Sequence, residues 1–362
     1  MKKIIWVILS FAFVVVVYIL YGNYKAKEGI RFVNSMGSGI NIGNSLDVTR
    51  VYEKKEDATV ENYETYWNNP PITKKLFSMI KKAGFGTVRI PVSWDEHMDE
   101  NGKLDEKWLD RIEEVVTYGI QEELYVILDT HHESWMTALP ENEVETKERL
   151  CILWQQIATR FADYPEKLLF EGMNEPRTIG SEDEWKGGTE EERKVINRLN
   201  NAFVETVRGL GVNNAKRWLI ITTYGGDYEE VALKELEIPK DDKIIVAVHA
   251  YIPYHFTQDK LGTSVWSEEN MYDAKPVEEL MGILHQIFIE KNIPVILTEF
   301  GCINKENPKE RLEWAQYYTE IAKKNSIGYI WWDNGNEYSL MDRENYSWKE
   351  QEIVEILTRF SR

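Results

Sequence analysis

The chain has 362 residues and a formal net charge of −18, and no cluster of basic residues interrupts its acidic character. These features exclude nucleic acid and anionic lipid surfaces as natural partners and favour a neutral substrate. Apolar residues make up 43% of the sequence, with 13 Trp and 19 Tyr, which excludes a disordered chain and supplies aromatic rings of the kind that stack on sugars.

The first residues predict an export or anchoring segment. Two lysines precede an uncharged apolar run over residues 4–20, which at about 1.5 Å per residue spans roughly 26 Å, enough for a membrane-spanning helix. Positive residues before such a run orient the rest of the chain out of the cytoplasm. Because bulky Tyr and charged Lys occupy the zone of a cleavage site, we expect a signal anchor rather than a removed signal peptide. Residues 1–28 are thus the predicted anchor or signal peptide, and residues 29–362 form one domain, membrane-anchored at the cell surface or secreted.

After this segment, short apolar stretches alternate with amphipathic ones. Strand followed by helix, repeated eight times, predicts a single (β/α)8 barrel. The chain has no GxGxxG turn and no GxxxxGK[ST] loop, which argues against nucleotide-binding α/β folds. The predicted strands cover residues 39–43, 87–91, 124–129, 168–173, 218–222, 244–248, 295–298 and 327–331, and the predicted helices include residues 73–82, 107–120, 147–161, 189–207, 277–291 and 309–324.

Two glutamates stand at the carboxyl ends of predicted strands, Glu175 after the fourth and Glu299 after the seventh. A lone glutamate in such a place is usually a solvated loop charge. In a parallel barrel, however, active sites are built at this end of the strands, so two carboxyls far apart in sequence can meet there. One could donate a proton while the other attacks, as cleavage of a glycosidic bond with retention requires. Further polar or aromatic residues end the other strands: Asn41, Asn44, Arg89, Asp129, His131, His132, Asn174, His249, Tyr251 and Trp332.

Eight short motifs follow one another in the predicted domain. They are GINIGNSLD (39–47), WNNP (67–70), VRIPVSW (88–94), HHE (131–133), EGMNEP (171–176), VHAY (248–251), TEFG (298–301) and WDNG (332–335). In this order they resemble glycoside hydrolase family 5, and within it the bacterial endo-β-1,4-glucanases and xyloglucanases. The resemblance implies a retaining (β/α)8 hydrolase that acts on a polysaccharide.

The resemblance also implies roles for single residues. Glu175 matches the acid/base and Glu299 the nucleophile of the family. Two positions depart from the family pattern: Asn68 stands where Gly is usual, and Asp129 where Asn commonly precedes Thr-His-His. Both concern the rim or a strand end, so they affect subsite detail and leave the reaction type intact. The supporting, substrate-binding positions of the family match Asn44, Arg89, His131 or His132, Asn174, His249, Tyr251 and Trp332.

Physical chemistry gives these side chains definite tasks. We expect Arg89, held by a bidentate pair, to favour the charged form of Glu299, and the neighbouring negative charge to raise the pKa of Glu175. Tyr251 could donate a hydrogen bond to the nucleophile, or be a buried tyrosine satisfied by backbone. Asn174 is the natural partner of the sugar 2-hydroxyl.

Tryptophans are candidates for the lining of a cleft. Trp332 is expected to stack on a sugar of the non-reducing side. Four others fall on strand-end loops, where each either lines the rim or covers its loop as hydrophobic packing. These four are Trp67, Trp94, Trp135 and Trp266.

Metal and disulfide chemistry have little support. His131, His132 and His249 invite a metal hypothesis, but there is no HExxH motif and no closely spaced third ligand, so we predict no metal and no organic cofactor. Cys151 and Cys302 have neither metal-type spacing nor a CxxC partner, which makes a disulfide framework unlikely to be the basis of stability.

The leading hypothesis is a retaining, endo-acting hydrolase of β-1,4-glucan chains, which are cellulose-like, mixed-linkage or xyloglucan. A β-mannanase on the same scaffold is the alternative among enzymes. A catalytically silent, polysaccharide-binding barrel at the cell surface is the alternative outside them, and a metal-dependent barrel hydrolase lacks its ligand pattern. We expect a monomer whose only contact with a membrane is the N-terminal apolar segment.

Overall fold

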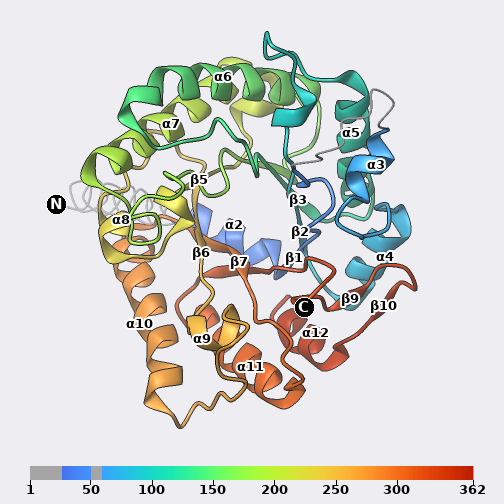
Figure 1. Cartoon of the computed structure of the whole chain (residues 1–362), viewed down its shortest axis with the longest axis vertical. Coiled ribbons are helices and arrows are strands. Elements are labelled where there is room, and N and C mark those ends of the chain that lie inside the picture. The colour runs from blue at the N-terminus through green and yellow to red at the C-terminus, as the bar shows by residue number, and fades with distance from the viewer. Residues whose placement is uncertain (1–26, 50–58, 362) are drawn as a thin grey trace, which may run out of the picture.

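The computed structural model describes residues 27–49 and 59–361, so the predicted anchor lies outside the described residues. Eight parallel strands pair in sequence order and β8 pairs with β1, which closes a barrel ringed by helices (Figure 1). The predicted (β/α)8 barrel is confirmed. In the part of the chain that is described, no helix has the length and apolar character needed to cross a bilayer.

The barrel strands are β1 (Gly39–Asn41), β2 (Thr87–Ile90), β3 (Tyr125–Asp129), β4 (Leu168–Glu171), β5 (Leu219–Thr222), β6 (Ile244–His249), β7 (Val295–Phe300) and β8 (Gly328–Trp331). The helices are α2 (Glu28–Met36), α3 (Val60–Glu64), α4 (Lys74–Ala83), α5 (Glu106–Gln121), α6 (Glu143–Arg160), α7 (Glu190–Gly209), α8 (Glu230–Lys234), α9 (Tyr254–Thr257), α10 (Met271–Ile287), α11 (Pro308–Lys324) and α12 (Gln351–Thr358). A small antiparallel pair, β9 (Met341–Asp342) and β10 (Ser347–Trp348), follows β8.

Most predicted boundaries agree with these within a few residues. The clearest error is α10, which begins at Met271 rather than at residue 277. Proline is more usual at the start of a helix than inside it, because it lacks the N–H that a helix interior uses. Instead, Asn270 caps the helix by accepting a hydrogen bond from the backbone N–H of Tyr272, and Pro276 lies inside the helix.

Alternate side chains of the strands point into the barrel and form two layers. The lower layer is apolar and packs against Val33 and Met36 of α2, which lies across the amino-terminal end of the strands (Figure 1). Two residues further along, the inward positions of five strands are polar and buried. The lower layer includes Ile127, Leu169, Ile220, Ala247 and Ile296, and the polar layer above it includes Asp129, Glu171, Thr222, His249 and Thr298.

The contact between α2 and the barrel depends on a glycine just before β2. A Cβ atom added at Gly86 would lie 2.1 Å from the backbone oxygen of Met36. That oxygen accepts a hydrogen bond from Oγ1 of Thr87 (2.9 Å), and the backbone N–H of Gly86 donates to Ser38 (3.0 Å). Only a residue without a side chain therefore allows this close approach.

We expect Gly86→Ala to lower the free energy of unfolding by about 1–3 kcal/mol, because the methyl group separates α2 from β2. Urea unfolding followed by circular dichroism measures this change. Gly282→Ala is the matched control, since a Cβ at Gly282 of α10 meets no heavy atom within 4 Å. This control should be neutral or stabilise by up to about 1 kcal/mol, because alanine favours helix. Equal stability of the two variants would contradict the prediction.

Candidate active site

The two predicted glutamates meet at the carboxyl end of the barrel. Glu175 lies four residues after β4, and Glu299 lies within β7. One carboxylate oxygen of each, together with a ring nitrogen of His249, lie within 4.8 Å of one another. The β6–β7 pairing sets His249 beside Glu299, and its register shifts just before this pair, as expected where a strand re-aims a side chain.

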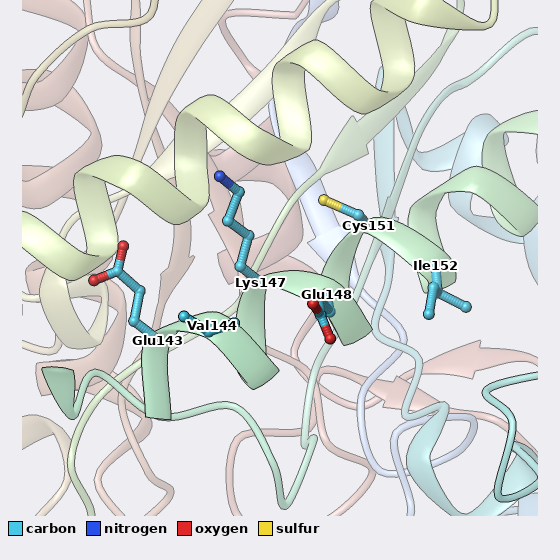
Figure 2. A pocket seen from close by; sticks show the side chains of 6 residues that line it. All are labelled: Glu143, Val144, Lys147, Glu148, Cys151 and Ile152. Atoms are coloured by element: carbon cyan, nitrogen blue, oxygen red, sulfur yellow. The ribbon is translucent and has the colours of Figure 1, made fainter. Parts of the chain in front are cut away.

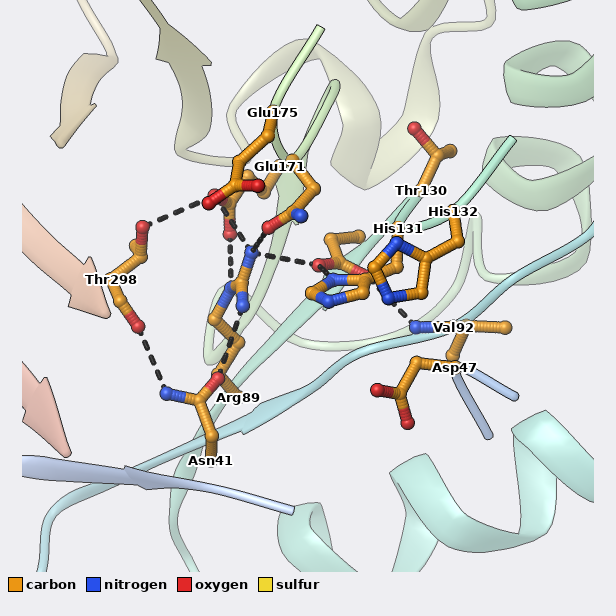
Figure 3. A network of polar contacts seen from close by, with 12 residues as sticks. Asn41, Asp47, Arg89, Val92, Thr130, His131, His132, Glu171, Glu175 and Thr298 are labelled. Carbon is orange, nitrogen blue, oxygen red and sulfur yellow. Dashed lines mark hydrogen bonds and ion pairs between the residues drawn. The ribbon is translucent and has the colours of Figure 1, made fainter. Parts of the chain in front are cut away.

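Arg89 of β2 is fully buried and contacts side chains of β1, β3, β4 and β7, and Figure 3 shows it between Asn41 of β1 and Glu171 of β4. Its bidentate partner is Glu171, with Nε 2.6 Å from Oε2 and Nη2 3.2 Å from Oε1. Nη2 also lies 2.8 Å from Oδ2 of Asp129, and Nη1 lies 2.9 Å from Oε1 of Glu299. Nη2 donates to Oδ1 of Asn174 as well (2.7 Å), so Arg89 fixes both the nucleophile candidate and the residue before Glu175.

The carboxylates around Arg89 outnumber its single positive charge. Burial raises the pKa of Asp129 to about 6, although Arg89 and the backbone N–H of Val92 act in the opposite direction. Burial likewise raises the pKa of Glu171, again against the charge of Arg89. The pKa of Arg89 is itself raised, because the attraction of Glu171, Asp129 and Glu299 outweighs the effect of its burial. The cluster therefore holds a firmly charged arginine and carboxyls that retain protons more readily than usual.

Sequence reasoning missed Glu171 as part of the site, and it named Asp129 only as a polar strand-end residue and as a departure from a motif. A signal for Glu171 did exist. Leu169 points into the barrel, and a strand alternates its faces, so the residue two positions later must also point inward. A buried charged residue at that position requires a partner of opposite charge, which Arg89 supplies.

Glu299 is held by hydrogen bonds to both of its oxygens. Arg89 contacts Oε1, and the hydroxyl of Tyr251 donates to Oε2 over 2.8 Å. Burial, with the negative charge of Glu299, raises the pKa of Tyr251 well above its usual value. The hydroxyl therefore stays protonated and remains a donor to the carboxylate.

Glu175 contacts two cationic groups. Its Oε1 lies 2.8 Å from Nδ1 of His249, and its Oε2 accepts a hydrogen bond from Nη1 of Arg177 over 3.2 Å. Burial alone would raise the pKa of Glu175, but His249 above all, followed by Arg177 and His131, lowers it to about 2. The pKa of His249 is raised, because Glu299 and Glu175 together outweigh its burial.

The expected rise in the pKa of Glu175 is therefore wrong for the ligand-free site. The argument from repulsion considered only the second glutamate, and no sequence pattern indicated a histidine within hydrogen-bond distance. Nδ1 of His249 and Oε1 of Glu175 are close enough to share a proton, and the lowered pKa of Glu175 together with the raised pKa of His249 favours a charged pair.

The remaining predicted residues lie around a cleft of about 780 Å³ above the polar layer. Nδ1 of His131 lies 2.7 Å from Oδ2 of Asp129, and burial lowers the pKa of His131 to about 3, so its ring is neutral. Its ring stacks on Trp332, with 5.7 Å between centroids and an interplanar angle of 3°. A Cβ at Gly43 would lie 2.6 Å from the Trp332 ring, so this glycine lets the indole lie against the backbone. The predicted residues that line the cleft are His131, His132, Asn174, Glu175, His249, Tyr251, Glu299 and Trp332.

For three of the four loop tryptophans the structure shows hydrophobic packing, the second of the two alternatives, rather than a place at the rim. Trp94 is fully buried and donates from Nε1 to the backbone oxygen of Asp129 (3.0 Å). Trp135 and Trp266 are also buried, since both fold back onto the hydrophobic core of their loops and helices. Trp67 is half-buried and its ring lies 6.3 Å from that of His132, at the edge of the cleft.

Two asparagines have mainly backbone roles. Asn44 has a positive φ of 57° and does not line the cleft, and its backbone oxygen accepts a hydrogen bond from the side chain of Asn69 (2.8 Å). Asn68 has a φ of 64°, a left-handed conformation that asparagine tolerates better than most residues. This explains how Asn can replace the glycine that is usual at this position.

Other lining residues were not predicted. Arg177 and Trp185 come from the loop between β4 and α7, and Trp185 is 56% exposed. An aromatic residue in a polar loop was the only signal for Trp185. The cleft is completed by Gly225, Gly226, Asp227, Tyr228, Glu229, Tyr254, Gln258 and Tyr338.

Two groups of described residues come close enough to hold a metal ion. In the first, Asp47 faces His131 and His132, but both carboxylate oxygens of Asp47 already accept backbone N–H groups, from Asn44 and Ser45. The second is the set of Glu175, His249 and Glu299, whose atoms bond to one another and to neighbouring cations. Hydrogen bonding thus accounts for the geometry of both groups.

A second hollow, of about 520 Å³, lies on the outer side of α6 (Figure 2). It is lined by Glu143, Val144, Lys147, Glu148, Cys151 and Ile152, and none of the carboxyl-end residues reaches it. Cys151 and Cys302 are both free thiols, in agreement with the expected lack of a disulfide framework.

Comparisons with known proteins identify the family of this chain. The sequence matches the family model described as cellulase, glycosyl hydrolase family 5, over residues 51–338. The chain belongs to glycosyl hydrolase family 5. It is 39% identical over 341 residues to Endoglucanase A of Clostridium longisporum, which covers 92% of this chain and 66% of that protein. It is also 39% identical over 341 residues to Endoglucanase A of Ruminococcus albus, which covers 90% of this chain and 91% of that protein. The chain thus spans slightly less than two thirds of the first relative's length.

Solved structures of this family have the same architecture. A broad specificity endoglucanase from Clostridium longisporum superimposes with a TM-score of 0.87 at 37% identity, covering 92% of this chain and 98% of the other. A xyloglucan-specific endo-β-1,4-glucanase from a metagenomic library, in complex with cellotriose, gives a TM-score of 0.86 at 38% identity. This match covers 92% of this chain and 99% of the other. A family 5 lichenase from Caldicellulosiruptor sp. F32 gives a TM-score of 0.87 at 34% identity. This match covers 92% of this chain and 96% of the other.

The raised pKa of Asp129 predicts a pH dependence of stability. Between its usual value of 3.8 and about 6, the folded state holds a proton that the unfolded state has released. Stability contributed by this group is therefore present below about pH 4 and is lost as pH rises through 6. We expect the unfolding free energy of the wild type, relative to Asp129→Asn, to fall by on the order of 1–3 kcal/mol over this range. Urea titrations at pH 4, 5, 6 and 7 measure it, and a difference that is constant or grows with pH would show that the pKa is not raised.

Proposed function

We propose that this chain is a retaining, endo-acting β-1,4-glucanase that works by double displacement between Glu175 and Glu299. The observation that carries the proposal is the short distance between their carboxylates. One oxygen of Glu175 and one oxygen of Glu299 lie within 4.8 Å of each other. Retaining glycosidases hold their carboxyl groups about 5–5.5 Å apart, whereas inverting enzymes need about 6.5–9.5 Å to admit a water molecule. The geometry favours attack by a carboxylate over attack by water.

In the first step, Glu299 attacks the anomeric carbon while Glu175 protonates the leaving oxygen. Glu299 suits the role of nucleophile because Arg89 and Tyr251 hold its two oxygens in fixed positions. These donors stabilise a charged carboxylate and orient it before the sugar arrives. In the second step, Glu175 removes a proton from water, which attacks the glycosyl ester.

We infer that the proton needed in the first step is held between Nδ1 of His249 and Oε1 of Glu175, which lie 2.8 Å apart. A sugar that fills the cleft removes water from Glu175 and so disfavours its charged form. The proton then has only one hydrogen bond to cross before it can reach the leaving oxygen.

Relatives and structural neighbours support glucan as the backbone. Curated relatives from Clostridium longisporum and Ruminococcus albus are named endoglucanases, and one structural neighbour, from Ruminococcus champanellensis, holds cellotriose. Neighbours named as a xyloglucan-specific enzyme and as a lichenase indicate that branched and mixed-linkage chains fit this type of cleft. These names favour a β-glucanase over a β-mannanase. The close pair of glutamates disfavours a silent binding barrel.

The cellular location follows from the N-terminal sequence alone. An uncharged run over residues 4–20 behind two lysines supports a barrel that faces the outside of the cell on a signal anchor. Such a location suits an enzyme whose substrate is a polymer too large to enter the cell.

The two glutamates should differ in their response to substitution. Glu299→Ala or Gln removes the only group that can form the glycosyl ester, so we expect a loss of at least about 10⁴-fold in kcat/KM. Glu175→Ala should still cleave an aryl β-cellobioside with an acidic leaving group, because that leaving group needs little protonation, and the glycosyl-enzyme should accumulate. Burst kinetics and mass spectrometry of the intact protein measure this.

Added azide distinguishes the roles by product configuration. In Glu175→Ala azide should speed turnover and give the β-glycosyl azide, whereas in Glu299→Ala it should give the α-anomer. Glu182→Gln, which changes an exposed glutamate on the same loop as Glu175, serves as the control and should behave like the wild type. The opposite pattern would mean that the roles are exchanged, and full activity of both variants would contradict the proposed mechanism.

Removal of residues 1–28 tests the location. The truncated protein should be soluble and keep its kcat/KM, because α2 loses only its first residue, Glu28, and the barrel strands begin at Gly39. The full-length protein should fractionate with membranes, and its N-terminal sequence should begin at or near Met1. A mature N-terminus beyond residue 25 would instead indicate a cleaved signal peptide.

A further inference from the structure

Arg177 links the acid/base candidate to a second charged residue of the same loop. Its Nη1 donates to Oε2 and to the backbone oxygen of Glu175, over 3.2 and 3.0 Å. Its Nε donates to Oε1 of Glu184 over 3.0 Å. The guanidinium also lies over the ring of Trp185, 4.3 Å from its centroid. Arg177 thus stands between two carboxylates, and the indole shields one side of it from solvent.

The loop holds this arrangement firmly. Oε2 of Glu184 accepts a hydrogen bond from the backbone N–H of Gly180 over 2.7 Å. The side chains of Arg177 and Glu184 are only 20% and 17% exposed. The backbone on either side of Arg177 is hydrogen-bonded to the segment after β5. The carbonyl of Pro176 accepts from the N–H of Gly225 (2.8 Å), and the N–H of Thr178 donates to the hydroxyl of Tyr224 (3.1 Å). The charges therefore keep fixed distances, which makes their effect on Glu175 specific.

We propose that Arg177 and Glu184 act as a pair of positioning residues that set the pH range in which Glu175 can serve as the acid. Arg177 orients the carboxyl and opposes its protonation, and Glu184 partly neutralises Arg177 and so restores the affinity for the proton. This inference rests on the proposed function, because it concerns the acid step of that reaction.

Other charged or titratable groups also face Glu175. His249 and Tyr251 approach from the end of β6, Glu299 from β7, and His131 and His132 from the loop after β3. These groups determine where the shared proton lies, and the Arg177–Glu184 pair adds to them from a separate loop. A change in the Arg177–Glu184 pair therefore shifts the titration of Glu175 while the positions of these other groups stay the same.

Two substitutions should move this titration in opposite directions. Arg177→Met removes a positive charge beside Glu175, so the Glu175–His249 unit should hold its proton to higher pH. Glu184→Gln leaves Arg177 without its counter-charge, so the unit should release its proton at lower pH. The alkaline limb of the kcat/KM profile for cellotetraose, whose sugar leaving group requires the acid, should move by about half a pH unit or more, upward in the first variant and downward in the second.

Matched controls separate this effect from a structural one. Glu182→Gln makes the same change of charge at a 92% exposed side chain of the same loop and should leave the limb in place. Arg177→Lys keeps the charge and should keep the limb near its wild-type position, even if kcat falls through poorer orientation. With 2,4-dinitrophenyl β-cellobioside, whose leaving group needs no acid, the limbs of all variants should coincide.

The outcomes are distinct. The inference would be overturned if the alkaline limb stayed in place in both Arg177→Met and Glu184→Gln, or if it moved in the same direction in both. It would also be overturned if the limb moved by the same amount with the dinitrophenyl substrate. Glu184→Gln preserves the shape of the side chain, so it provides a folded test even if Arg177→Met does not fold. A wild-type protein that hydrolyses no β-glucan and no aryl β-cellobioside would refute the proposed function itself, whereas an active wild type with unmoved limbs would refute only the role of this pair.

Discussion

The buried guanidinium of Arg89 is the interaction on which the catalytic end of the barrel depends. It contacts carboxylates from three strands, Asp129 of β3, Glu171 of β4 and Glu299 of β7. A charge removed from water is tolerable only with partners, and each partner here is equally buried and equally in need of Arg89. The strands are therefore linked by charge as well as by backbone hydrogen bonds. Because only one of the three carboxylates is the nucleophile candidate, the other two serve to hold Arg89 in place.

The division of the barrel into an apolar and a polar layer makes this cluster possible. Below it, Ile127, Leu169 and Ile296 pack with α2 into a dry and rigid base. Close packing of this kind resists small displacements, so the polar side chains one step above it keep their geometry. A glycosidase needs its carboxyls placed within a fraction of an ångström, and Glu299, which lies within β7, has this precision because a strand holds its position better than a loop does.

Sequence alone predicted the barrel and both glutamates, because each depends on a simple periodicity or on the end of a strand. Strand alternation contains enough information to place Glu171 in the site as well. Trp94 and Trp266 could not be assigned in this way, because an aromatic residue on a loop can either line a cleft or pack into the core. Only the path of the loop decides between the two. Arg177 and Trp185 lie on an aperiodic loop, so their approach to Glu175 depends on tertiary structure.

The pKa of Glu175 shows why charges are harder to predict than folds. The sequence indicated a second negative charge nearby, from which a raised pKa followed, but the sign depends on the nearest partner. His249 lies 2.8 Å from one oxygen and Arg177 lies 3.2 Å from the other, and at such distances each outweighs a carboxylate that is further away. A shift of half an ångström in either contact would alter the balance, and no pattern in the sequence reports distances of that size.

The arrangement of charges also suits a reaction that ends with the same net charge as it begins. In the proposed glycosylation step, Glu299 loses its negative charge as it forms an ester, while Glu175 gains one as it gives up its proton. Only one of these two reacting carboxyls is therefore charged before and after the proposed step, and this charge moves from the side of Arg89 to the side of Arg177. A fixed set of donors can stabilise both states without rearrangement, because an acceptor for each cation remains in place: Glu171 and Asp129 for Arg89, and Glu184 for Arg177. The buried carboxylates that take no part in the chemistry thus keep each arginine paired while the reacting charge moves between them.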